Sequence, residues 1–128
     1  MEESGLFKIY RQVEGAFRGQ RPGRSAQAVC IIDRILIPTR KLRDAGWRLP
    51  IGVEIKASGE KCGPAIAQAI DYTNTAFCVE VDDWNTIDVV LRYVFLWPLE
   101  KRYRDLESIT LQQGIGCIYE TSSAALIF

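Results

Sequence analysis

The chain has 128 residues, four cysteines, no histidine and no net charge. This length fits a single domain over residues 1–128 that can bury its own core. The lack of histidine excludes Ser-His-Asp and Cys-His catalysis and histidine-ligated metal sites. Acid–base or metal chemistry must therefore come from carboxylates, lysines and tyrosines, and carboxylates favour hard cations such as magnesium, manganese or calcium.

Charge is distributed unevenly along the chain. Residues 1–61 carry a net charge of +5 and residues 62–128 a net charge of −5. The basic half can bind phosphates, although charge alone favours a solvated surface. No apolar run approaches the roughly 18 residues of a membrane span, and the N-terminus has no signal-peptide pattern. We expect a soluble, cytoplasmic protein with no membrane partner.

The first half of the chain predicts one helix and two strands. Residues 5–17 carry apolar side chains at helical spacing and predict a helix. Residues 27–37 are apolar and β-branched and predict a strand that Pro38 ends. After a charged connection over residues 39–50, the alternating residues 51–57 predict a second strand.

The second half predicts a helix over residues 65–74, a buried strand over residues 76–81 and a turn at residues 82–85. Residues 86–96 fit either a helix or a buried strand. Beyond them the pattern predicts a helix over residues 100–113 and a terminal hairpin of residues 115–119 and 124–128. This order predicts an α/β fold with a mixed sheet and helices packed against it.

Two of these strands carry the residues of chemical interest. Glu54 and Lys56 are two positions apart and point to the same face of a strand. Asp33 lies inside an apolar strand, where an uncompensated carboxylate is costly to bury. If the two strands pair, Asp33 lies beside Glu54, and the two carboxylates repel each other until a metal ion or Lys56 compensates them. Taken singly, such residues are usually solvated or part of a turn.

An apolar strand with Asp33, a strand with Glu54-Ile55-Lys56 and then a helix resemble the PD-(D/E)xK nuclease superfamily over residues 9–81. The resemblance implies a restriction-endonuclease-like α-β-β-β-α-β core, with a mixed central sheet flanked by helices. It implies that Asp33 and Glu54 ligate magnesium, for which manganese can substitute, and that Lys56 positions or activates the attacking water. Ile32 stands where the motif has proline, a position that varies in the superfamily.

Further residues extend the resemblance. Glu14, on the predicted first helix, is either another metal ligand or an exposed side chain. Gln68 and Tyr72 share a helix face and resemble the Q-x-x-x-Y element of RecB-like nucleases, which implies a role in DNA binding. Their alternative is an amphipathic pair facing the core. The arginines that we assign to nucleic-acid binding are Arg18, Arg21, Arg24, Arg34, Arg40 and Arg43.

The leading hypothesis is a metal-dependent deoxyribonuclease, a structure-selective or resolvase-like endonuclease. It could act as a homodimer, with the apolar residues 87–97 as the candidate interface. The second hypothesis is a catalytically inactive nuclease-fold module for nucleic-acid binding or assembly. The third is an interaction protein that binds no nucleic acid and matches the motif by chance. The sequence leaves open DNA or RNA as the substrate, endo or exo cleavage, the preferred nucleic-acid structure and the oligomeric state.

Overall fold

The computed structural model describes residues 2–3, 5–18, 29–55, 62–97, 114–120 and 125–127. Within these ranges the fold is α/β, with one mixed sheet and two helices. The elements are β1 (Glu2–Glu3), β2 (Phe7–Phe17), β3 (Val29–Pro38), α1 (Arg40–Asp44), β4 (Ile51–Ile55), α2 (Cys62–Thr73), β5 (Thr75–Glu80), β6 (Thr86–Val90), β7 (Tyr93–Trp97), β8 (Ile115–Glu120) and β9 (Ala125–Ile127).

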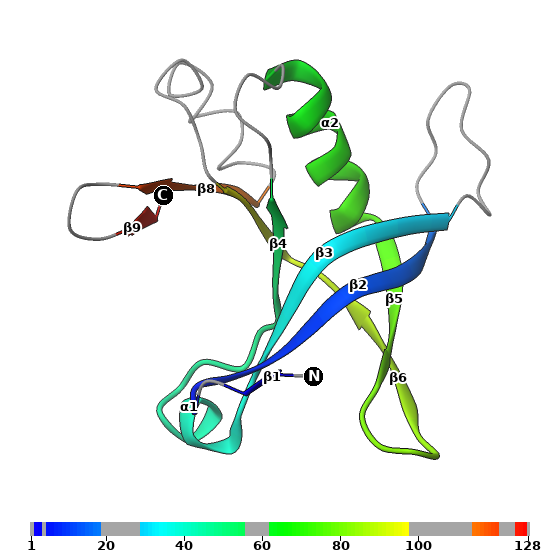
Figure 1. The fold of residues 1–128 in the computed structure, drawn as a ribbon, viewed down its shortest axis with the longest axis vertical. Coiled ribbons are helices and arrows are strands. Elements are labelled where there is room, and N and C mark those ends of the chain that lie inside the picture. The colour runs from blue at the N-terminus through cyan, green and yellow to red at the C-terminus, as the bar shows by residue number, and fades with distance from the viewer. Residues whose placement is uncertain are drawn as a thin grey trace.

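The strand order across the sheet is β6-β5-β2-β3-β4-β7-β8-β9, with β1 paired to β2. Strands β2, β3 and β4 form an antiparallel meander. After α2 and the β5–β6 hairpin, the chain returns as β7, which pairs parallel to β4. Figure 1 shows β2 and β3 as a long curved ribbon that ends at α1. Strand β5 pairs with β2 at the end far from α1, and from there β5 and β6 diverge from the ribbon.

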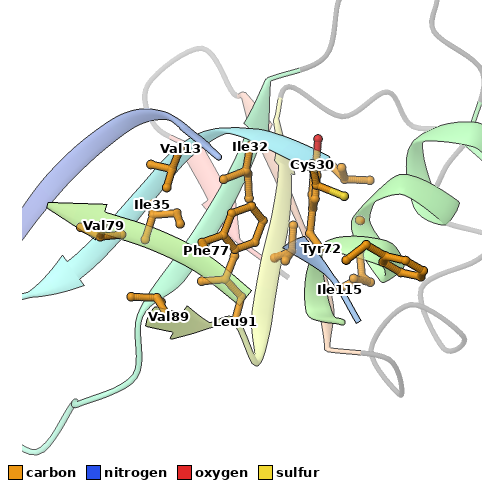
Figure 2. Close-up of a cluster of buried hydrophobic side chains, with 14 of the residues drawn as sticks. Val13, Cys30, Ile32, Ile35, Tyr72, Phe77, Val79, Val89, Leu91 and Ile115 are labelled. Atoms are coloured by element: carbon orange, nitrogen blue, oxygen red, sulfur yellow. The ribbon is translucent and has the colours of Figure 1, made fainter. Parts of the chain in front are cut away.

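The core lies on the face of the sheet that α2 covers. Val13, Ile32, Ile35, Phe77 and Tyr72 come together there from β2, β3, β5 and α2 (Figure 2). Their burial, at about 1.5–3 kcal/mol for each large apolar side chain, is the main term that holds the strands to the helix.

Strand β4 comes unusually close to this core. A Cβ atom at Gly52 would lie 2.6 Å from Leu91 Cδ1 and 2.8 Å from Ile32 Cδ1, so a larger residue there would force these side chains to move. The face of β4 that carries Gly52 therefore looks into the core, and Glu54, two positions further on, lies on the same face.

The predicted helix over residues 5–17 is wrong, because this segment is β2. It pairs with β3 from Phe7↔Pro38 to Ala16↔Val29. The backbone of Gln12 adopts a left-handed conformation, with φ of 48°. This reverses the alternation of the strand, so that Tyr10 and Val13 both face the core. Their three-residue spacing imitates a helical pattern, and cross-strand pairing overrides it.

The other predicted elements agree better with the structure. The strands over residues 27–37, 51–57 and 76–81 are confirmed as β3, β4 and β5, and the helix over residues 65–74 is α2. Hydrogen bonds from the backbone of Trp84 and Asn85 to Asp82 Oδ1, both 2.9 Å, form the predicted turn.

The last part of the chain also follows the prediction where it is described. Of the two alternatives for residues 86–96, the strand is correct, although the chain forms two strands, β6 and β7. The terminal hairpin is confirmed by the antiparallel pairing of β8 and β9. The predicted helix over residues 100–113 lies outside the described residues. None of the helices in the described ranges is long and apolar enough to cross a membrane.

Candidate functional site

Asp33 and Glu54 lie together where the β3–β4 ladder ends. The ladder runs from Leu36↔Ile51 to Arg34↔Val53, and the next register position would pair Asp33 with Glu54. Beyond the last ladder pair, side-chain carboxylates accept hydrogen bonds from the backbone of the neighbouring strand. The Asp33 N–H donates to Glu54 Oε2 at 3.2 Å, and the Ile55 N–H donates to Asp33 Oδ2 at 2.8 Å. Each carboxylate therefore accepts a hydrogen bond from the backbone of the other strand. The sequence predicted only repulsion between the two carboxylates and not these hydrogen bonds.

Gln12 completes this junction from the third strand. It lies opposite Asp33 in β2, between the ladder pairs Arg11↔Arg34 and Val13↔Ile32. Its Nε2 donates to Asp33 Oδ1 at 2.9 Å. The left-handed conformation of a residue other than glycine costs roughly 1–2 kcal/mol. Such strain at a polar junction is typical of functional sites.

Glu54 is a buried carboxylate held beside a buried tyrosine. Its exposed fraction is 7% and that of Tyr72 is 2%. The Tyr72 hydroxyl donates to the Ile31 carbonyl at 2.9 Å. Burial raises the pKa of Tyr72 well above its ordinary range, and the adjacent Glu54 carboxylate raises it further. Tyr72 therefore stays protonated and remains a hydrogen-bond donor at this site.

The carboxylates of Asp33 and Glu54 place oxygen atoms close together at this junction. Hard cations such as magnesium and manganese take oxygen ligands of this kind. Asp33 and Glu54 are therefore the described residues that could ligate such an ion.

The structure does not bring Glu14 to this pair. Glu14 is an exposed residue of β2, and its neighbours Val13 and Gly15 point to the core face that also carries Glu54. Glu14 therefore points to the opposite face. In the described ranges, no group of three or more Cys, Asp or Glu side chains could hold a metal ion. Lys56, the predicted catalytic lysine, lies outside the described residues.

Gln68 and Tyr72 lie on α2 with different surroundings. Gln68 is half-buried, whereas Tyr72 belongs to the hydrophobic core and contacts Phe77 edge-on, with ring centroids 5.9 Å apart. A side chain buried to this extent has almost no surface to offer to a nucleic acid. The geometry instead connects Tyr72 with Glu54.

The arginines predicted to bind nucleic acid do not form one patch. Arg18 lies at the end of β2 beside α2, where its N–H donates to the Asn74 carbonyl at 2.7 Å. Arg40 and Arg43 lie on α1, at the far end of β3. The ten residues of β3 separate these places by roughly 33 Å. Arg21 and Arg24 are outside the described residues.

Two residues near the carboxylates were missed by sequence reasoning. Arg11 is the cross-strand partner of Arg34, whose Nη1 donates to the Asp33 carbonyl at 2.7 Å. Both arginines point away from the face that carries Glu54, because Tyr10 and Ile35 beside them face the core and Arg34 is opposite Val53. Gln12 is the second missed residue. No local signal identifies either residue, because both depend on the β2–β3 register.

The apolar segment over residues 87–97 mostly serves the chain's own core. Val89, Leu91, Val94 and Leu96 are all buried within it. Among its aliphatic residues Ile87 and Val90 remain exposed, at 42% and 62%. The segment therefore offers much less apolar surface to a second copy than its composition indicates.

Comparisons of the chain with models of protein families, with curated proteins and with solved structures give no match.

Proposed function

We propose that the chain is a divalent-metal-dependent nuclease that hydrolyses phosphodiester bonds in DNA, as a structure-selective or resolvase-like endonuclease. The observation that carries the proposal is the pairing of Asp33 and Glu54 across the diverging ends of β3 and β4. Asp33 and Glu54 would hold Mg²⁺ or Mn²⁺, and Lys56 would position the attacking water. A metal ion in this place would polarise the phosphate and acidify the water.

The chain connectivity supports this proposal. An antiparallel meander β2-β3-β4, then α2, then a strand parallel to β4 is compatible with the β-β-β-α-β order of the restriction-endonuclease-like core. The β5–β6 hairpin would be an addition at the β2 edge. Strands β2, β3 and β4 would fill the three strand positions of that core. Among the described residues no helix precedes β2.

Arg11 and Arg34 lie side by side one residue beyond Gln12 and Asp33, on the face of the sheet opposite Glu54. Guanidinium groups bind phosphate oxygens with two parallel hydrogen bonds. We assign to Arg11, Arg34, Arg40 and Arg43 contacts with the nucleic-acid backbone away from the scissile bond.

Cleavage assays test the function. Branched, duplex and single-stranded DNA and RNA are incubated with magnesium, manganese or EDTA, and we expect cleavage only with a metal. Glu54→Gln and Lys56→Ala should each lower the rate by about 100-fold or more, because each removes a group needed for the transition state. Glu80→Gln, an exposed carboxylate on β5, is the matched control. Folded Glu54→Gln and Lys56→Ala proteins that cut at the wild-type rate would contradict the assignment.

One observation favours a second candidate, an inactive nuclease-fold module for nucleic-acid binding or assembly. Both Asp33 carboxylate oxygens already accept hydrogen bonds, from Gln12 and from Ile55. Asp33 therefore joins three strands without any metal ion. Manganese binding followed by electron paramagnetic resonance separates the two candidates, because an inactive module predicts that Glu54→Gln leaves manganese binding unchanged.

A further inference from the structure

A hollow of about 510 Å³ lies at the end of the β2–β3 ladder away from the carboxylate pair. Its walls come from β2, β3, α1 and the two ends of the β5–β6 turn. Figure 1 shows β2 and β3 running toward α1 and diverging from the β5–β6 hairpin. Four cationic side chains line the hollow, and within the described part of the chain no Asp or Glu does: Lys8, Arg40, Lys41 and Arg43.

The fold holds these cations in place through contacts at the start of α1. The Thr39 hydroxyl donates to the Gly5 carbonyl at 2.8 Å, and the Thr39 N–H donates to the Leu6 carbonyl at 2.8 Å. Arg43 Nη1 donates to the Pro38 carbonyl at 2.9 Å. Lys8 is fixed by its ladder position opposite Ile37. Lys8 therefore meets the three cations of α1 because of the fold, although it is distant from them in the sequence.

Few described contacts neutralise this charge. Arg40 forms an ion pair with Asp44 at 3.8 Å, but both side chains are largely exposed, with fractions of 88% and 72%. An exposed pair of this kind is weak. Four like charges around one hollow repel one another, and an anion bound between them would relieve that repulsion.

The remaining walls fit an organic group attached to the anion. Tyr10, Ile37, Val81 and Ile87 give the hollow an aromatic and aliphatic side. The Tyr10 hydroxyl, whose pKa is raised by burial, adds a polar group to this side. The volume lies within the range of roughly 300–1,000 Å³ that small-molecule sites occupy. A lone inorganic phosphate would leave most of this apolar side uncovered.

We propose that this hollow binds a nucleoside phosphate, with the phosphate on Lys8, Lys41 and Arg43 and the sugar and base against the apolar side. The same chemistry is offered by a free nucleotide and by the phosphorylated end of a nucleic-acid strand. The site shares Arg40 and Arg43 with the nucleic-acid contacts proposed above, but it needs neither the carboxylate pair nor a metal ion. It can therefore be tested apart from cleavage.

The test is isothermal titration calorimetry in EDTA with the whole chain. The probes are inorganic phosphate, thymidine 5′-monophosphate, and a ten-residue thymidine oligonucleotide with and without a 5′-phosphate. We expect the monophosphate to bind more tightly than inorganic phosphate. The double variant Lys8→Gln/Lys41→Gln should weaken its binding at least tenfold, because charge-assisted hydrogen bonds to phosphate are lost. Lys8→Gln keeps most of the aliphatic stem, which protects the fold.

Two controls make the outcome decisive. Arg92→Gln removes an exposed cation that does not line the hollow and should leave nucleotide binding unchanged. Glu54→Gln should abolish cleavage but not nucleotide binding, so failure of the nuclease proposal and failure of this one are distinguishable.

The oligonucleotides identify the source of the ligand. Tighter binding of the 5′-phosphorylated strand than of the unphosphorylated strand indicates a strand end. Binding of the monophosphate without this difference indicates a free nucleotide. The proposal is overturned if the monophosphate does not bind, or if the double variant, folded by circular dichroism, binds it as tightly as the wild type does.

Discussion

Replacing Tyr72 by phenylalanine removes a single oxygen atom at the centre of the candidate site. The Ile31 carbonyl loses the hydrogen bond of 2.9 Å that the Tyr72 hydroxyl donates. This hydrogen bond is partly buried and Ile31 is 47% exposed, so its loss should cost about 0.5–1.5 kcal/mol, the net contribution of a typical intramolecular hydrogen bond. The ring of residue 72 still packs against Phe77, so no cavity forms. We therefore expect the free energy of unfolding at neutral pH to fall by about 0.5–1.5 kcal/mol.

The same substitution has a signature at alkaline pH. Tyr72 has a pKa raised from its ordinary value of 10.0 by burial first and then by the Glu54 carboxylate. Above pH 10 the unfolded chain releases the phenolic proton, while the folded chain retains it. The folded state then binds more protons, so its stability falls as the pH rises, by up to about 1.4 kcal/mol per pH unit. The stabilising contribution is complete below pH 10.

Urea unfolding of the wild type, Tyr72→Phe and Tyr93→Phe between pH 7 and pH 11.5 measures both effects. Tyr93 is an exposed tyrosine and serves as the matched control. Other tyrosines and the lysines titrate in the same range, so the informative quantity is the difference between variants. We expect Tyr72→Phe to lose stability less steeply than the wild type above pH 10. Equal alkaline slopes in all three proteins would refute the reasoning about Tyr72.

Two further predictions concern the junction around Asp33. In a thermal-shift titration, Asp33→Asn and Asp33→Ala should both lose the manganese-induced rise in melting temperature. Only Asp33→Ala should destabilise the metal-free protein, by about 1–3 kcal/mol, because the Ile55 N–H then lacks an acceptor. An unchanged manganese shift in Asp33→Asn would argue against Asp33 as a ligand. In urea unfolding, Gln12→Val should be less stable than Gln12→Gly by at least about 1 kcal/mol, because a β-branched residue disfavours the left-handed conformation. Equal stabilities of the two variants would show that the positive φ at residue 12 carries no strain.

Local sequence patterns were sufficient to predict an element where the segment strongly prefers one type of secondary structure. The β-branched runs of β3 and β4 and the turn residues that flank them predict strands on their own. Residues 65–74 predict α2 in the same way. The adjacency of Asp33 and Glu54 also follows once these two strands pair as neighbours. The sequence by itself therefore determined the strands and the helix on which the candidate site is built.

The tertiary structure decided how those elements meet. Residues 7–17 have a helical spacing, yet the long ladder with β3 makes them a strand, and the reversal at Gln12 turns Glu14 away from Glu54. The same register sets Arg11 beside Arg34. The cations from Lys8 to Arg43 gather at one hollow only because α1 folds back on the start of β2. These outcomes depend on cross-strand register and side-chain contacts between distant segments, which local propensity does not encode.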